Sequence, residues 1–154
     1  AVVFYRAQLY SDTLLQVAFL GFTIYGWVHW KRGLREEGIV RVEVLGRSTA
    51  LTGLAIGVVG SFALGFIMKQ YTNAALPHID STLTCFSLVA TWWQTRKHTA
   101  SWLLWIAVDC VYTGVFLYKN LYWTSVLYLL LIFLAVLGLR DWKRAADSQR
   151  QRPD

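Results

Sequence analysis

The sequence has little of the chemistry that enzymes and metal-binding proteins use. It holds two cysteines, Cys85 and Cys110, and neither belongs to a Cys-x-x-Cys pair or a cysteine–histidine cluster. The case for a disulfide or a metal site is therefore weak. No Gly-x-x-x-x-Gly-Lys-Ser/Thr phosphate-binding loop occurs, so this chain is not expected to hydrolyse ATP by that route. We expect no cofactor and no metal.

Coupled catalytic groups are missing as well. An enzyme working inside a membrane needs a nucleophile beside a base, or a metal cluster, and no group of His, Cys, Asp and Glu falls at one depth of the apolar runs. His29, His78 and His98 stand at the edges of these runs. The first ten residues have neither the basic start nor the cleavage site of a signal peptide. We therefore expect a protein that is not an enzyme.

Apolar residues, by contrast, are abundant, at 56% of 154 residues. They form stretches of about 17 to 20 residues separated by short charged segments, which is the signature of an all-α polytopic membrane protein. The formal charge is +6, but the basic residues lie between the apolar runs and form no stripe. We interpret them as topology signals and expect a lipid bilayer, not a nucleic acid, as the partner.

The runs predict five crossings. We expect membrane helices at residues 11–30, 48–68, 80–94, 101–118 and 122–139, with a cytoplasmic loop at 33–47 and a polar tail at 145–154. Small residues recur every four positions along 48–68, at Gly53, Gly57, Ser61 and Gly65, a pattern that favours close packing of another helix.

Positive charge predicts the orientation. Five Lys and Arg residues lie in 31–47, two lie at 96–97 and five follow residue 139, whereas Arg6, Lys69 and Lys119 are the basic residues of the other side. Because cytoplasmic loops carry an excess of Lys and Arg, we expect the C-terminus in the cytoplasm.

An internal repeat is also visible. Residues 1–32 align with 113–144 without a gap, with nine identities that include an LY pair at 9–10 and a WKR run at 30–32. Parallel repeats are a known transporter architecture. We interpret 1–32 as the end of a first three-helix repeat, 48–68 as a linker helix and 77–144 as the second repeat. A counterpart of 77–112 would precede residue 1, so the N-terminal helices of a 3+1+3 fold are expected to be missing from this chain.

The run from Trp102 to Lys119 carries the main candidate site, because Asp109 stands near its middle. A carboxylate there costs roughly 2.5 to 3.5 kcal/mol on insertion scales, so it should face a protein interior. Trp102, Trp105, Asp109, Tyr112 and Phe116 recur at helical spacing and share one face. Such a stripe could stack on a flat, cationic small molecule.

Two further stripes accompany it. The first crossing places Gln16 on a face with Phe19, and the amide of Gln16 could bind a ligand or a neighbouring helix. Hydroxyls and Gln94 step along 80–94, a face that should border water or substrate, although hydroxyls can also bond to the preceding turn. The candidate substrate-binding residues are Gln16, Thr23, Thr91, Trp105, Asp109, Tyr112 and Tyr128, and the candidate gate or pathway residues are Asp12, Trp27, Trp30 and Asp80.

Segments 9–32 and 80–143 resemble the Pnu family of vitamin transporters, in particular the nicotinamide riboside transporters of the PnuC type. The matching motifs are LLQ at 14–16, YGWxxW at 25–30, DS at 80–81 and WLLW at 102–105. The resemblance implies a 3+1+3 fold related to the sugar-transporting SWEET proteins. It also implies uptake of nicotinamide riboside across the bacterial inner membrane by facilitated diffusion, for NAD biosynthesis, with a soluble kinase trapping the product by phosphorylation.

One position departs from that family. An asparagine is typical where this chain has Asp109, and an ionised aspartate only accepts hydrogen bonds and adds negative charge. The change suits a cationic ligand, and both nicotinamide riboside and thiamine are cations. Transport of another vitamin such as thiamine, proton coupling through Asp109, and a role as a substrate-binding membrane subunit remain open alternatives. The sequence is also compatible with a homo-oligomer.

Overall fold

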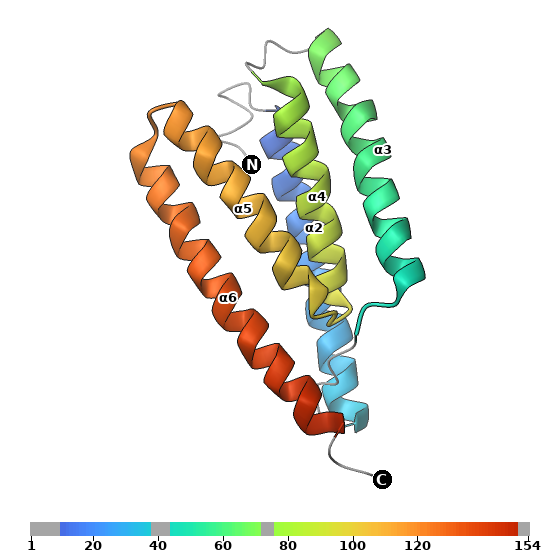
Figure 1. Ribbon diagram of the computed structural model, residues 1–154. Coiled ribbons are helices and arrows are strands. Elements are labelled where there is room, and N and C mark those ends of the chain that lie inside the picture. Colours follow the sequence, from blue (N-terminus) through green and yellow to red (C-terminus); the bar gives the residue numbers. More distant parts are fainter. Residues whose placement is uncertain (1–9, 38–43, 72–75, 151–154) are drawn as a thin grey trace.

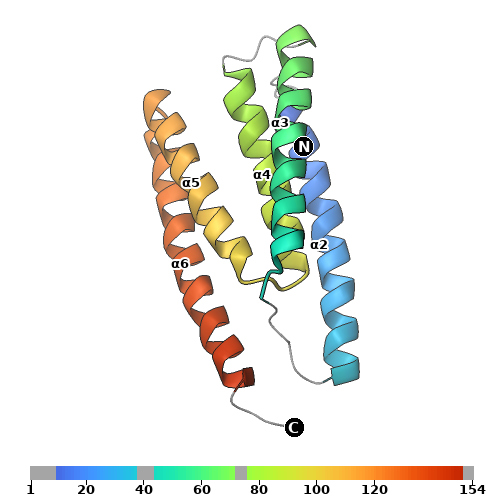
Figure 2. The same cartoon turned by 45° about the vertical axis from the view of Figure 1, so that its right-hand side comes forward.

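The computed structural model describes residues 10–37, 44–71 and 76–150, which fold into five α-helices (Figure 1). They are α2 (Tyr10–Glu37), α3 (Arg47–Tyr71), α4 (Pro77–Thr95), α5 (Ala100–Tyr118) and α6 (Tyr122–Arg150). Helix α4 is central, because it packs against α2, α3 and α5, while α6 packs on α5. Figure 2 shows α3 beside α4, and α6 beside α5, from a second direction.

The stripe of small residues on α3 brings α3 and α4 close together. Gly53, Gly57, Ser61 and Gly65 are all buried. A Cβ atom added to Gly53 would lie 2.8 Å from the indole of Trp93 on α4, and one added to Gly57 would lie 3.0 Å from the ring of Phe86. The predicted packing role of this stripe is therefore confirmed, since aromatic rings of α4 occupy the space that side chains on α3 would need.

Two tight turns make α4, α5 and α6 successive antiparallel neighbours. At the end of α4, Lys97 has φ 60°, its N–H donates to the carbonyl of Gln94, and the N–H of His98 donates to that of Trp93. Asn120 (φ 58°) ends α5 with the same pair of bonds. This left-handed cap closes a helix within two residues, so the last turn of α4 faces the first turn of α5.

Two helices run further than expected. Helix α2 continues to Glu37 and α6 to Arg150, so residues 33–37 are not a loop and residues 145–150 are a continuation of the last helix. The physical reason is that an apolar run ends where the membrane ends, whereas a helix ends where its backbone is capped. The Arg, Glu, Lys and Ala residues that follow the two apolar runs are good helix formers in water.

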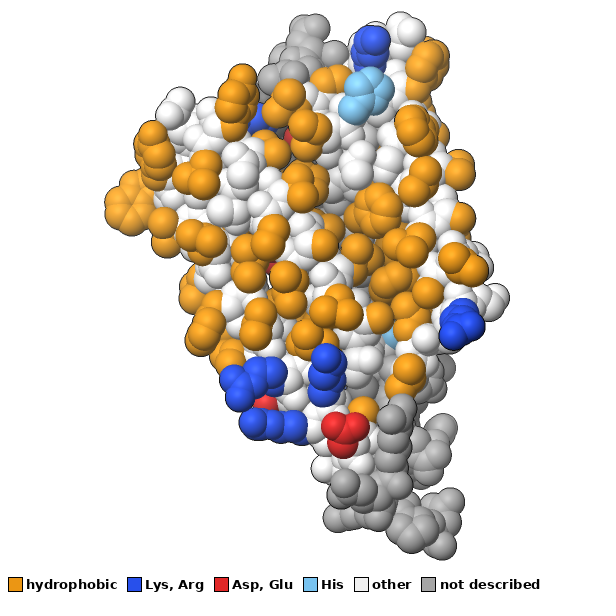
Figure 3. Space-filling view, in the orientation of Figure 1, with side chains coloured by type: hydrophobic (Ala, Val, Ile, Leu, Met, Phe, Trp, Pro, Cys, Tyr) orange, Lys and Arg blue, Asp and Glu red, His pale blue; other side chains and the backbone are white. Residues whose placement is uncertain are grey.

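Three described helices are long and apolar enough to cross a membrane, namely α3, α5 and α6 as far as Ser148. Helix α2 contains a shorter apolar part, Gln16–Val28, and α4 carries the stripe of hydroxyls that lowers its hydropathy. The prediction of five crossings therefore stays a prediction. On the visible face, apolar side chains cover the middle of the molecule, and basic ones gather toward the end of α6 (Figure 3).

Candidate functional site

A cavity of about 330 Å³ lies between α2, α4, α5 and α6. This volume is within the range of small-molecule sites. The lining is mostly aromatic and apolar, with three polar side chains from α4 and α5. It consists of Phe19, Ser87, Gln94, Trp102, Trp105, Asp109, Tyr112, Tyr128, Leu131, Leu134 and Ala135.

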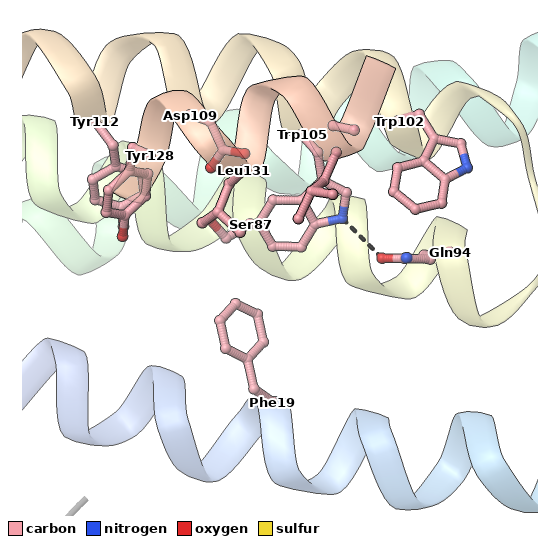
Figure 4. A pocket seen from close by; sticks show the side chains of 11 residues that line it. Phe19, Ser87, Gln94, Trp102, Trp105, Asp109, Tyr112, Tyr128 and Leu131 are labelled. Atoms are coloured by element: carbon pink, nitrogen blue, oxygen red, sulfur yellow. Dashed lines mark hydrogen bonds between the residues drawn. The ribbon is translucent and has the colours of Figure 1, made fainter. Parts of the chain in front are cut away.

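Asp109 is the charged group among the described residues of this lining. The residue is 4% exposed, and its carboxylate makes no hydrogen bond or ion pair with any residue that the structure describes. Its backbone carbonyl accepts the hydroxyl of Thr113 at 2.8 Å. Figure 4 shows the carboxylate between the tyrosine pair and Trp105. A buried carboxylate without a partner is unfavourable, so this one is poised to bind a positively charged or hydrogen-bond-donating ligand.

Aromatic rings stand on both sides of Asp109. Toward the α5–α6 turn, Tyr112 and Tyr128 have ring centroids 4.8 Å apart, and Phe116 lies 5.2 Å from Tyr128. Toward the α4–α5 turn, Trp105 lies 6.1 Å from Phe19 of α2. The rings offer flat faces to a ligand, and such faces attract cations.

Gln94 connects α4 to the site. Its side-chain Oε1 accepts a hydrogen bond from Nε1–H of Trp105 at 2.9 Å, which Figure 4 draws as a dashed line. The left-handed cap at Lys97 turns the chain so that Gln94, near the end of α4, lies opposite Trp105, near the start of α5. The hydrogen bond therefore sets the plane of an indole that forms part of the cavity wall.

Four of the predicted substrate-binding residues come together here: Trp105, Asp109, Tyr112 and Tyr128 all line the cavity. Ser87 and Gln94 also line it, so the polar face of α4 does border the site as expected. Sequence reasoning missed Phe19, Leu131, Leu134 and Ala135 as site residues. The repeat pairs Phe19 with Leu131, and both line the cavity, but it held no signal for Leu134 and Ala135.

Other candidates lie elsewhere. Gln16 and Thr23 are exposed on α2, and the hydroxyl of Thr23 donates to the carbonyl of Phe19 at 2.7 Å. The hydroxyl of Thr91 likewise donates to the carbonyl of Ser87. None of the three is among the residues that line the cavity. Their contact with substrate stays a prediction.

Two of the four candidate gate residues, Trp27 and Asp80, are also apart from the cavity. Trp27 is 64% exposed, with the ammonium of Lys31 4.8 Å from its ring centroid. Asp80 is partly buried in the first turn of α4. The side chains of Asp12 and Trp30 lie outside the described residues. Within the described ranges, no three His, Cys, Asp or Glu side chains are grouped so that they could hold a metal ion.

The sequence profile of the nicotinamide mononucleotide transporter family matches residues 1–144. The chain belongs to this family. Nicotinamide riboside transporter PnuC of Escherichia coli strain K12 is 29% identical over 176 residues, which cover 98% of this chain and 74% of that protein, and PnuC of Shigella flexneri matches equally well. The family resemblance read from the motifs is thereby confirmed.

The fold of this chain is also found in a solved structure. The crystal structure of the vitamin B3 transporter PnuC matches with a TM-score of 0.73 at 20% identity, over 94% of this chain. The chain spans 66% of that solved chain, or about two-thirds of its length. An all-helical membrane protein is thus confirmed, and the relatives are named as transporters, which agrees with the expectation that the chain is not an enzyme.

Proposed function

We propose that this protein transports nicotinamide riboside across the bacterial inner membrane by facilitated diffusion. A soluble kinase inside the cell would phosphorylate the product and so prevent its return. The observation that carries the proposal is Asp109, a buried carboxylate without a partner among the described residues, set in an aromatic cavity. Nicotinamide riboside offers what this site lacks, namely a flat, positively charged ring with hydrogen-bonding hydroxyls.

The charge of the cavity favours a riboside over its mononucleotide. A phosphate monoester carries about −1.5 to −2 charges at neutral pH, and the described residues that line the cavity include Asp109 but no Lys or Arg. A phosphate buried there would be repelled by Asp109 and would find no cationic side chain among the described lining residues. Thiamine is also a flat cation without phosphate, so it is the alternative substrate that the same observation allows.

A 3+1+3 architecture is part of the proposal, with α3 as the linker and α4 to α6 as the second repeat. The internal alignment supports it, since Gly26 of α2 pairs with Gly138 of α6. A Cβ atom on Gly26 would lie 3.2 Å from Thr95, and one on Gly138 would lie 2.7 Å from Trp102. Both glycines thus allow close approach of the α4–α5 hairpin.

The residues outside the cavity would act along the route. Gln16, Thr23 and Thr91 would contact the substrate as it enters or leaves. The gate or pathway positions would be Asp12, Trp27, Trp30 and Asp80. The C-terminus would face the cytoplasm.

Calorimetric binding to the purified protein tests the substrate. We expect nicotinamide riboside to bind and its mononucleotide to bind at least tenfold more weakly, because about 1.4 kcal/mol of charge repulsion suffices for that factor. Uptake into liposomes should proceed without a pH gradient. Binding of thiamine alone would move the assignment to that vitamin, and binding of neither cation would refute the proposal.

A further inference from the structure

The hydrogen bond between Gln94 and Trp105 determines which end of the Gln94 amide remains available. An indole N–H is a donor only, so the amide atom that faces it must be the oxygen. The Nε2 amino group, with two N–H donors, makes no hydrogen bond with any described residue. Gln94 thus offers N–H donors to the end of the cavity next to the α4–α5 turn, while one lone pair of its Oε1 is engaged by the indole.

Asp109 gives the other part of the cavity the opposite character. It lies four residues after Trp105 on α5, which corresponds to about 6 Å along the helix axis. Its carboxylate, when ionised, accepts hydrogen bonds and attracts positive charge. Figure 4 shows Gln94 and Asp109 on opposite sides of the Trp105 indole. The two parts of the cavity therefore differ: the Gln94 amide offers hydrogen-bond donors at one end, and the Asp109 carboxylate offers a negatively charged acceptor further along.

We propose that Gln94, held by Trp105, orients the ligand with a hydrogen-bond acceptor toward the α4–α5 turn and its cationic part toward Asp109. This inference rests on the proposed function, and for nicotinamide riboside the acceptor is the oxygen of the carboxamide. The Trp105 indole holds the Gln94 amide in one orientation. The amide in turn donates a hydrogen bond to the ligand. It is a specificity residue in addition to a link between two helices.

The test compares two ligands, nicotinamide riboside and the pyridinium riboside that lacks the carboxamide. The wild-type protein should bind the first about tenfold more tightly, the factor expected for one hydrogen bond in a cavity. Gln94→Glu keeps an acceptor for the indole but has no N–H donor, so the ratio of the two dissociation constants should fall to near one. Gln94→Met, which has neither group, should also abolish the preference, and Trp105→Phe should reduce it by freeing the amide.

Gln70→Glu is the matched control, because Gln70 is exposed near the end of α3 and away from the cavity. It should retain the wild-type ratio. Melting temperatures of all variants separate a loss of fold from a loss of preference, and Gln94→Met supplies the answer if Gln94→Glu does not fold. A wild-type protein that binds both ribosides equally, or Gln94 variants that keep the preference, would overturn the orienting role alone. A wild-type protein that binds neither riboside would overturn the proposed function together with it.

Discussion

Asp109 combines two properties that are unfavourable together, burial at 4% exposure and the absence of a hydrogen-bond or ion-pair partner among the described residues. Proteins keep buried charges paired unless the charge has a use. The aromatic rings around it could not replace the water that an ionised carboxylate loses, although a bound cation could. We therefore expect Asp109 to lower the stability of the unliganded protein and to raise its affinity for a cationic ligand.

These opposite effects predict that removal of the charge gives a variant that is more stable and binds the ligand less tightly. Asp109→Asn removes the charge and keeps the shape, so the melting temperature in detergent should rise while the affinity for nicotinamide riboside falls about tenfold or more. Asp141→Asn, on the exposed part of α6, should change neither quantity. If Asp109→Asn still transports the riboside at the wild-type rate, proton coupling through Asp109 is excluded.

At the scale of the elements, the close contact of α3 and α4 depends on the absence of side chains on one face of α3. Trp93 is 4% exposed and lies over Gly53. Gln94, which lines the cavity, follows Trp93 in the last turn of α4. We therefore expect the glycines of α3 to support the cavity indirectly, because they permit the close contact between α3 and α4.

Two glycine substitutions test this dependence. Gly53→Ala places a Cβ atom 2.8 Å from the Trp93 indole and should lower stability by about 1 to 3 kcal/mol, as overpacking does. Gly114→Ala, on α5, meets nothing within 4 Å and should be neutral or stabilising by up to about 1 kcal/mol through helix propensity. Thermal unfolding followed by tryptophan fluorescence would measure both, and equal effects of the two changes would contradict the packing argument.

Across the whole molecule, the ends of α2, α4 and α6 and the start of α3 lie at the same end of the bundle (Figure 1). The basic groups that follow the apolar runs, such as Lys31, Arg96 and Arg144, are thereby collected on one side. Because cytoplasmic loops carry an excess of Lys and Arg, the proposed topology places that side in the cytoplasm.

Single cysteines would measure the orientation. In a background with Cys85 and Cys110 changed to serine, Tyr71→Cys at the end of α3 should react with a membrane-impermeant maleimide in intact spheroplasts, because Tyr71 is 82% exposed. Ser148→Cys, near the end of α6, should react only after permeabilisation. Labelling of Ser148→Cys in intact spheroplasts would reverse the proposed topology.

Much of the helix pattern could be predicted because its cause is local. Apolar runs, the position of Asp109 within one of them, and the shared face of Trp105, Asp109 and Tyr112 all follow from helical spacing. The helix ends were harder, as α2 and α6 show, since charged residues outside a membrane continue a helix as readily as they end one. The family assignment also came from short local motifs.

The composition of the cavity was decided by tertiary structure. Gln16 and Phe19 share a face of α2 on spacing alone, yet Phe19 reaches the cavity and Gln16 does not. Nothing in the spacing of α4 places Gln94 against Trp105, because that contact depends on the left-handed turn at Lys97. The sequence by itself determined the helices and the faces they present, through the period of the backbone. Which faces meet depends on the rotation of each helix against its neighbours, and packing between distant residues sets that rotation.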